Sequence, residues 1–388
     1  MRLSTVSYFA FAGFGMFWGT WGATLPGLRD GAGLTDPELG IALLCVGIGA
    51  VPAMAVTGRA VDRFGVRVTG IPLIALALSG IVLAAFARDF VTLAVGMLLV
   101  GATSGASDVA ANALAGLAER RSGRRVITLA HGVFSSFVVA GSLGTGALIA
   151  MSNNLALTYS LSGLLISSAG AAVLCFGDGP HPRQPTQSST PDSKQWAVLP
   201  FVAVGMVGAL GFAIENAHQS WSAIFLTDEL HATPLIAALA PATFAAFAAA
   251  TRFGVGVSTR IPDGVLLIGG AMTAVAGTLL LATAQNIPLA VIGLALAAVG
   301  TSVLFPTLLS RATRDVPDGT RGRATAAVGT TAYLGYVLGP AFVGALAGAL
   351  DLRGAMIGVA ALAAVFALLT PLVTRRKRSS GAQPNASQ

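Results

Sequence analysis

Charged residues are scarce in this sequence. Only 10% of its 388 residues are Asp, Glu, Lys or Arg, whereas 54% are hydrophobic. A soluble protein of this length needs far more charge to cover its surface, so the composition excludes an ordinary soluble fold. Apolar stretches of about 20 residues, the length that crosses a bilayer as a helix, recur along the whole sequence. We therefore predict an all-α, polytopic membrane protein.

Cysteine is also scarce, and recognisable catalytic and metal-binding motifs are missing. Cys45 and Cys175 both lie in apolar stretches without metal-ligand spacing, which predicts neither a disulfide framework nor a zinc site. The sequence has no Walker-type phosphate loop and no HExxH motif, and His131 has no evident catalytic partner. We expect a protein that is not an enzyme and that uses no cofactor or metal.

Basic residues give a formal net charge of +7, but they are spread over short loops. A nucleic-acid-binding surface would gather them on one folded face, so we expect no nucleic-acid partner. If the N-terminus is cytoplasmic, only Arg29, Arg88 and Arg353 of the 23 Lys and Arg residues fall outside. This asymmetry indicates an even number of spans, with both termini on the cytoplasmic side of the cytoplasmic membrane.

Twelve apolar segments are long enough to span a membrane, and the first is interpreted as an uncleaved span. They lie at about residues 5–27, 36–57, 67–87, 90–117, 126–151, 154–176, 196–226, 233–257, 264–284, 287–310, 322–349 and 353–374. A polar break separates six spans from six. We predict an N-terminal half (1–176), a cytoplasmic linker (177–195), a C-terminal half (196–374) and a cytoplasmic tail (375–388). Similar basic loops at 119–125 and 311–323 indicate internal duplication and pseudo-symmetric halves.

Two of the 16 acidic residues, Asp108 and Glu215, lie deep within apolar segments. An ionised carboxylate at the bilayer centre costs at least about 2.5 kcal/mol, so a membrane protein usually has one for a function. A carboxyl group removed from water binds a proton more readily, and proton binding can be coupled to solute binding. We hypothesise that Asp108 is the proton carrier and Glu215 the second coupling residue. Alternatively, Asp108 bonds a neighbouring helix through Asn112, and Glu215 is a solvated residue of an outer gate.

Polar residues share helical faces with these acids, Asn216 and Gln219 follow Glu215, and Trp21 shares a face with Thr24 in the first span, with Trp18 close by. Ser104 and Asn112 lie four residues either side of Asp108, and His218 follows Glu215 by three. Aromatic planes and amides suit sugars and other polar organic molecules. The predicted solute cavity comprises Trp18, Trp21, Thr24, Ser104, Asn112, Asn216, His218 and Gln219. Alternatively, the tryptophans are interface anchors or core residues, and His218 serves packing. Tyr333 and Tyr336 are expected to be packing residues.

The loop after the second predicted span reads GRAVDRFGVR (58–67), which resembles the G-x-x-x-D-R-x-G-x-R signature of the major facilitator superfamily. Together with the six-plus-six arrangement and the long central break, this resemblance covers essentially the whole chain. The stretches DVAANA (108–113), ENAHQSWSAIFLTDEL (215–230) and AYLGYVLGPAFVGALA (332–347) further resemble the YbjJ-like branch, which is distantly similar to fucose:proton symporters. The corresponding loop of the second half, RFGVGVSTRIPDG (252–264), lacks the Asp-Arg pair.

The resemblance implies a major facilitator fold in which spans one, four, seven and ten line a central cavity. Asp108 and Glu215 would then lie on opposite halves of that cavity. The resemblance also implies that the signature residues form a charge latch at the cytoplasmic surface; these are Gly58, Asp62, Arg63, Gly65 and Arg67. The alternative for the arginines of the latch is ordinary positive-inside charge.

These observations favour a monomeric, proton-coupled secondary transporter, embedded in membrane lipid. We expect it to move a small organic solute, sugar-like or another polar metabolite, by alternating access. One alternative is a proton-driven antiporter that exports drugs or metabolites, because the glycine-rich stretch GSLGTGALIA (141–150) faintly resembles such proteins. A second alternative is a non-transporting membrane receptor with the same fold.

Overall fold

The computed structural model describes residues 2–177, 198–257 and 261–374. Within these residues the chain forms helices α1 to α14 and one short 3-10 helix, η1, and no β-strand. The prediction of an all-α fold is therefore confirmed. The predicted tail (375–388) and all but the first residue of the predicted linker (177–195) lie outside the described residues.

The N-terminal half supplies the first six predicted spans. Its helices are α1 (Leu3–Gly31), α2 (Asp36–Phe64), η1 (Val66–Thr69) with α3 (Gly70–Phe86), α4 (Phe90–Ser122), α5 (Val126–Ser152) and α6 (Leu155–Phe176). Capping residues set the helix ends. At the start of α4, the Asp89 carboxylate accepts a hydrogen bond of 2.8 Å from the backbone N–H of Thr92, which lowers the pKa of Asp89. At its end, Gly123 adopts a φ of 65°, which glycine tolerates best.

The C-terminal half supplies the remaining spans, two of which are divided. Its helices are α7 (Leu199–Leu230), α8 (Pro234–Ala237) with α9 (Leu239–Val257), α10 (Asp263–Ala282), α11 (Ile287–Thr301) with α12 (Leu304–Thr313), α13 (Asp318–Ala349) and α14 (Leu352–Thr374). A proline inside a helix cannot donate to the carbonyl four residues earlier and clashes with it. The break between α11 and α12 lies at Ser302 and Val303, and Ser302 is the residue four before Pro306.

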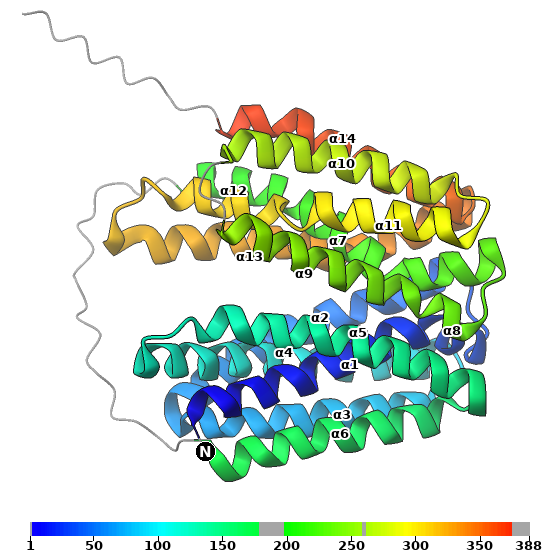
Figure 1. Ribbon diagram of the computed structural model, residues 1–388, viewed down its shortest axis with the longest axis horizontal. Coiled ribbons are helices and arrows are strands. Elements are labelled where there is room, and N and C mark those ends of the chain that lie inside the picture. Colours follow the sequence, from blue (N-terminus) through cyan, green and yellow to red (C-terminus); the bar gives the residue numbers. More distant parts are fainter. Residues whose placement is uncertain (1, 178–197, 258–260, 375–388) are drawn as a thin grey trace, which may run out of the picture.

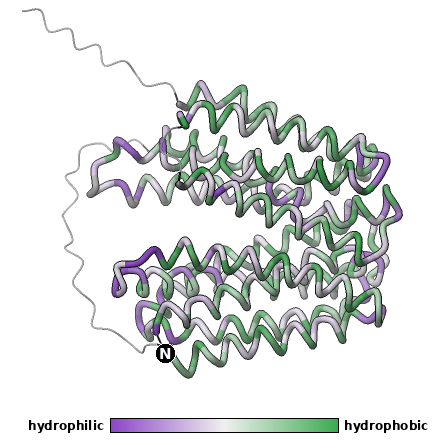
Figure 2. The backbone as a smooth tube through the Cα atoms, viewed as in Figure 1, coloured by the Kyte–Doolittle hydropathy of each residue, from purple (hydrophilic) through white to green (hydrophobic). Residues whose placement is uncertain are grey.

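Length and apolar composition agree with a membrane location. Eleven segments of the described chain are long and apolar enough to cross a membrane, and α1 is outside this set. The sequence of α1 is rich in glycine and contains two tryptophans, and most of its residues are buried against other helices. Figure 2 shows hydrophobic residues along the bodies of the helices and hydrophilic residues mainly at their ends.

The same helix pairings occur in both halves. In the N-terminal half α1 packs against α5, α2 against α4, and α3 against α6. In the C-terminal half the equivalent spans pack in the same way, α7 against α13, α9 against α11, and α10 against α14. Figure 1 shows the two halves as separate bundles of roughly parallel and antiparallel helices. This repetition agrees with the duplication that the basic loops indicate.

Glycines allow several of these helices to approach closely. A Cβ atom at Gly101 of α4 would collide with the backbone of Val46 in α2. A Cβ atom at Gly335 of α13 would collide with the backbone of Ala209 in α7. Lipid gives helices no hydrophobic reason to associate, so close backbone packing of this kind stabilises the bundle.

The two ends of the bundle differ. We call the end at which α1 begins and α14 ends the terminus end, and the end at which α1 and α7 finish the Arg29 end. Figure 1 shows the two halves apart at the terminus end and adjacent at the Arg29 end, near α8. At the Arg29 end, the Ser142 hydroxyl of α5 donates to the carbonyl of Ala238 at 2.7 Å. Gly348 of α13 packs against Pro37 of α2 there as well.

Candidate functional site

A cavity of about 300 Å³ lies between the two halves, near the middle of the helices. It is lined by α1, α2, α4 and α5 from one half and by α7, α9 and α13 from the other. Its charged residues are Asp108, Glu215 and Arg252. Aromatic side chains form much of the remaining wall: Phe14, Trp18, Trp21, Phe134, Phe212, Phe244, Tyr333 and Tyr336. Such a lining, mostly apolar with a few polar groups, is typical of a small-molecule site.

Asp108 lines this cavity from the middle of α4. The side-chain amide of Asn112, one turn along the same helix, donates to Asp108 Oδ1 at 2.9 Å and to the Asp108 carbonyl at 2.9 Å. Among the described residues, no hydrogen bond from Asp108 to a second helix is recorded. The alternative that Asp108 serves as a bond between helices therefore gains no support from these contacts.

Glu215 faces the same cavity from α7, in the other half. Arg252 of α9 donates through Nη2 to Glu215 Oε1 at 2.8 Å and to Oε2 at 3.0 Å. Gln219, one turn further along α7, donates to Glu215 Oε1 at 3.2 Å. The Glu215 side chain is 12% exposed and that of Arg252 is 44% exposed. Glu215 is thus already neutralised by a cation, whereas Asp108 is not.

Arg252 is a functional candidate that sequence reasoning misses, because it counts among the positive charges of the cytoplasmic side. Its Nε donates to the carbonyl of Ser302 at 3.1 Å. Pro306 leaves this carbonyl without its helical donor, since proline has no N–H. Two features of the sequence could have identified Arg252. It lies inside the predicted span 233–257, and Pro306 predicts an unpaired backbone carbonyl at Ser302 that a donor such as arginine can bind.

A second proline has the same effect on α13. Pro340 cannot donate to the carbonyl of Tyr336, which instead accepts a hydrogen bond of 2.5 Å from the Asn216 amide of α7. Ser220 donates to Asn216 Oδ1 at 2.9 Å, which fixes the orientation of the amide. Asn216 therefore lines the cavity and also ties α7 to α13.

Tyr333 and Tyr336 were expected to be packing residues, but both line the cavity. Their rings lie stacked, with centroids 5.4 Å apart and planes 23° from parallel. Trp18 and Trp21 lie on α1, with ring centroids 6.1 Å apart. The structure therefore brings aromatic residues from α1 and α13 to one cavity.

Five of the eight residues predicted to form the solute cavity belong to its lining: Trp18, Trp21, Ser104, Asn216 and Gln219. Thr24, Asn112 and His218 do not belong to it, and the solute-binding role of all eight residues stays a prediction. The hydroxyl of Thr24 is buried against Tyr159 OH at 2.8 Å. Asn112 lies behind Asp108 as its hydrogen-bond donor.

His218 is fully buried outside the cavity lining, and its ring stacks on that of Phe244, which does line the cavity. Its Nδ1 lies 2.7 Å from the carbonyl of Ile214, and its Nε2 lies 3.0 Å from the hydroxyl of Thr278 in α10. Successive helical residues point about 100° apart, so a cavity that contains Glu215 and Gln219 leaves His218 on a different face. The three-residue spacing between Glu215 and His218 was therefore not enough to predict whether His218 lines the cavity.

The expectation that spans one, four, seven and ten line the cavity is correct only for the first three. The tenth span, α11 and α12, contributes no residue to the lining. Phe305 of α12 packs on Phe212 of α7, with ring centroids 4.2 Å apart, and Phe212 is the one that faces the cavity. The tenth span therefore lies behind the cavity wall. Its Ser302 carbonyl accepts the hydrogen bond that orients Arg252, which does line the cavity.

The signature residues Gly58, Asp62, Arg63, Gly65 and Arg67 lie together at the terminus end, outside the cavity. Gly65 has a φ of 80° and ends α2, which accounts for a glycine at this position. The Arg63 guanidinium lies over the ring of Phe64, and Arg67 Nε donates to the carbonyl of Leu174 in α6. These contacts of Arg63 and Arg67 both stay within the N-terminal half.

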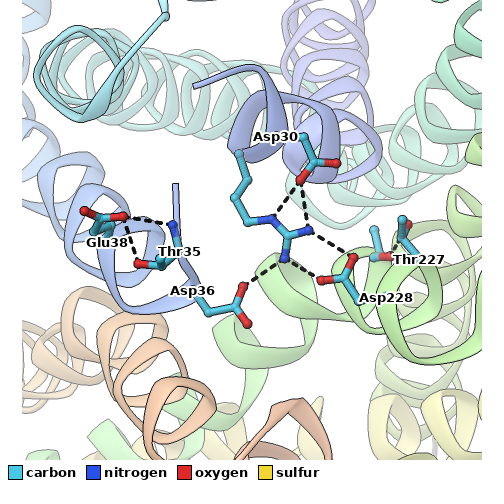
Figure 3. Close-up of polar contacts among 8 residues, drawn as sticks. Asp30, Thr35, Asp36, Glu38, Thr227 and Asp228 are labelled. Atoms are coloured by element: carbon cyan, nitrogen blue, oxygen red, sulfur yellow. Dashed lines mark hydrogen bonds and ion pairs between the residues drawn. The ribbon is translucent and has the colours of Figure 1, made fainter. Parts of the chain in front are cut away.

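Arg29 forms the principal ion cluster at the opposite end (Figure 3). Its Nη1 lies 2.5 Å from Asp228 Oδ2 and 2.8 Å from Asp36 Oδ1, and its Nη2 lies 2.9 Å from Asp30 Oδ1 and 3.0 Å from Asp228 Oδ1. Asp228 belongs to α7, so this cluster joins the two halves. Burial alone would lower the pKa of Arg29, but the hydrogen bonds and charges of the carboxylates outweigh burial and raise it.

Comparisons with known proteins agree with the geometry. Residues 7–262 and 205–388 match the Major Facilitator Superfamily. The chain is 30% identical over 385 residues to an uncharacterized MFS-type transporter of Yersinia pestis, covering 96% of each chain. Among solved structures, it resembles a point mutant of the nucleoside transporter NupG, with a TM-score of 0.76 at 14% identity over 96% of this chain and 100% of that one.

A bacterial homolog of the human lysosomal transporter Spinster is also similar, with a TM-score of 0.75 and 16% identity over 96% of each chain. At these identities the solved structures establish the fold alone, and the family rests on the sequence matches. These matches confirm a multi-pass membrane protein that is not an enzyme. The YbjJ-like branch stays a prediction. The chain belongs to the major facilitator superfamily of membrane transporters.

Proposed function

We propose that this protein is a proton-coupled secondary transporter that moves a small organic solute across the cytoplasmic membrane by alternating access. The observation that best supports this proposal is that Asp108 and Glu215 line one cavity from opposite halves of the protein. A solute bound between these acids touches both halves. A change in the charge of either acid therefore alters solute affinity and the energy of contact between the halves at the same time.

Asp108 is proposed to be the proton carrier and Glu215 the second coupling residue. The Asp108 carboxylate accepts a hydrogen bond from the neutral amide of Asn112, and among the described residues it forms no ion pair. Its charge can therefore be neutralised by a proton without breaking an ion pair. Glu215 is already paired with Arg252, whose positive charge compensates its own.

The solute is proposed to contact Trp18, Trp21, Ser104, Asn216 and Gln219, which all line the cavity. Aromatic planes provide apolar contact area, and the amides and hydroxyl provide oriented hydrogen bonds. A small polar metabolite, sugar-like or otherwise, has both kinds of surface. Thr24, Asn112 and His218 are proposed only as supporting residues, because their polar atoms are engaged outside the cavity lining.

Alternating access requires the Arg29 end to open and the terminus end to close. The Arg29–Asp228 bonds cross between the halves, so they must break in that step. Both termini are proposed to be cytoplasmic, which makes the terminus end the cytoplasmic side. The signature residues at that end, including Asp62, are then proposed to form a latch when the halves approach there. The protein is proposed to act as a monomer.

Import by symport is the proposed direction, in keeping with the resemblance to the YbjJ-like branch and fucose:proton symporters. An antiporter that exports a drug or metabolite moves protons in the opposite sense relative to the solute. A receptor that does not transport moves neither. Proton movement driven by solute therefore separates the three possibilities.

The test uses the purified full chain in proteoliposomes that contain a pH-sensitive dye. Sugars, small metabolites and amphipathic drugs are added outside in turn. Symport predicts that an accepted solute acidifies the vesicle interior, and antiport predicts that it makes the interior alkaline. Asp108→Asn is expected to reduce the signal to that of vesicles without protein, because the amide cannot exchange a proton.

Asp89→Asn is the matched control, since it makes the same change at the N-cap of the same helix, outside the cavity. Asn caps a helix about as well as Asp does, so transport should be preserved. Full proton movement in Asp108→Asn would exclude this residue as the proton carrier. Absence of any solute-driven proton movement in the wild type would contradict proton-coupled transport.

A further inference from the structure

Among the described residues that line the cavity, Arg252 is the only basic one. Its guanidinium is held from two directions, by the carbonyl of Ser302 on Nε and by the carboxylate of Glu215 on Nη2. No partner of Nη1 is recorded within the described part of the chain. With 44% of its side chain exposed, Arg252 is an oriented cation with an unused pair of hydrogen-bond donors at the cavity wall.

The contribution of this ion pair to stability does not explain its presence. Both residues belong to the C-terminal half, so the pair does not hold the two halves together. Solvent reaches the Arg252 side chain, which is 44% exposed, and screens its interaction with Glu215, so the pair contributes little to the free energy of folding. An arginine in the membrane-embedded part of a protein is costly and usually marks a functional site. A ligand that uses the cation accounts for both observations.

We propose that Arg252 binds an anionic group of the transported solute, a carboxylate, and that Glu215 occupies this place when no solute is bound. This inference rests on the proposed function, because it names the chemical class of the solute. A guanidinium binds a carboxylate best through two parallel N–H donors. Glu215 uses Nη2 alone, so a solute carboxylate that engages Nη1 and Nη2 together gains a charged hydrogen bond.

The rest of the cavity suits an organic anion with an aromatic or other planar body. Trp18, Trp21 and Tyr333 supply flat apolar surfaces, and a volume of about 300 Å³ limits the solute to a small molecule. Asp108 on the opposite half repels an anion when it is ionised and does not when it is protonated. Binding of the anion is therefore coupled to a proton on Asp108, which is the sense of symport. The other titratable groups near these positions are Glu215 from α7, His131 from α5, and Tyr333 and Tyr336 from α13.

Equilibrium binding tests the inference without any need for transport. The probes are benzoate, phenylacetate and indole-3-acetate, each compared with its uncharged amide, and 2-phenylethylamine as a cation of matching shape. Calorimetry with the purified full chain in detergent is expected to show saturable binding of at least one carboxylate. The amide and the amine should bind about tenfold more weakly, or worse, because they lack the charged bond to Arg252.

Variants identify the residue responsible. Arg252→Gln should lower the affinity for the carboxylate about 10- to 100-fold and leave the affinity for the amide within about twofold. Arg252→Lys keeps the charge but loses the two parallel donors, so its affinity should be intermediate. Glu215→Gln should bind the carboxylate at least as tightly as the wild type, because the competing carboxylate is gone. A merely structural role for the pair predicts instead that Glu215→Gln and Arg252→Gln lose binding alike.

Arg314→Gln is the matched control. Arg314 also binds a carboxylate, that of Asp263 at 2.9 Å, but it lies outside the cavity lining and its side chain is 56% exposed. This variant should bind the carboxylate as the wild type does. Thermal unfolding of each variant separates loss of the site from loss of the fold, and Arg252→Lys remains informative if Arg252→Gln unfolds.

Three results would overturn the inference: no saturable binding of any of the three carboxylates, tighter binding of the amine than of the carboxylates, or equal carboxylate binding by wild type and Arg252→Gln. Its failure is separable from failure of the proposed function. Carboxylate binding that depends on Arg252, without any solute-driven proton movement, would refute proton-coupled transport and leave this inference intact. Proton movement driven only by uncharged sugars, and unchanged in Arg252→Gln, would do the reverse.

Discussion

Two arginines in this protein bind carboxylates in different surroundings. The Arg29 side chain is 11% exposed and contacts Asp30, Asp36 and Asp228, and through Asp228 it connects the halves (Figure 3). Arg252 has a side chain that is 44% exposed and contacts Glu215 within one half. The comparison shows that the same chemical pairing serves different purposes. A saturated, buried cation that crosses the interface stabilises one arrangement of the halves, whereas an exposed cation with an unused donor remains available to a solute.

The largest expected effect separates the two arginines by stability. Arg29→Gln leaves Asp36 and Asp228, whose side chains are only 21% and 30% exposed, without their cation, which should lower the free energy of unfolding by about 2 kcal/mol. Arg252→Gln removes a partly exposed pair and should cost about 1 kcal/mol or less. Thermal unfolding of the purified full chain in detergent measures both. Equal unfolding midpoints for the two variants would remove the distinction between the clusters.

A smaller effect is expected on the arrangement of the halves. Asp228 is the member of the Arg29 cluster that comes from the C-terminal half, so Asp228→Asn weakens the connection and should favour opening of the Arg29 end by about tenfold. Spin labels at Gly31→Cys and His231→Cys, in a variant with Cys45 and Cys175 replaced by Ser, should then show a larger population of long distances.

Asp30→Asn is the control for this experiment, because Asp30 lies in the same half as Arg29 and its side chain is 61% exposed. An exposed pair contributes little, so this variant should keep the distance distribution of the wild type. If Asp30→Asn opened the Arg29 end as much as Asp228→Asn, the cluster would act through its total charge and not through a bond across the halves.

The smallest effect on stability is expected at the terminus end. No ion pair of Asp62 is recorded among the described residues, so Asp62→Asn should leave the unfolding midpoint of this arrangement unchanged. A latch that forms only when the terminus end closes predicts instead a changed transport rate and a larger population open at that end. Unchanged transport and an unchanged distance distribution would reduce the signature to ordinary positive-inside charge.

Local features of the sequence predicted the fold and part of the site. Asp108 could be identified because a charge inside an apolar segment is visible without knowledge of the partner helices. Trp21 was chosen by helical periodicity, and Trp18 and Gln219 were chosen because they lie close to Trp21 and Glu215 in the sequence; all three line the cavity. Helical spacing failed for Thr24 and His218, because a side chain three residues along a helix points about 60° away from the first one.

Residues whose role depends on a distant partner could not be predicted in the same way. Arg252 resembles a positive charge at the membrane surface, since nothing near it in the sequence is acidic. Its partner Glu215 is 37 residues away, and its second partner, the Ser302 carbonyl, is 50 residues away. Tyr333 and Tyr336 face the cavity because α13 packs beside α7. That packing includes the hydrogen bond from the Asn216 amide to the Tyr336 carbonyl, which Pro340 leaves without a helical donor.

Composition, segment length and spacing are enough to establish a chain that crosses the membrane many times, in two similar halves, with two acids deep inside its apolar segments. They are enough because the bilayer imposes the same requirement on every span. Which side chains share the cavity, and which arginine connects the halves, became apparent only in the folded chain. Those outcomes depend on how each helix is rotated against its neighbours, which is set by close packing between residues as far apart as Arg29 and Asp228, 199 positions along the chain.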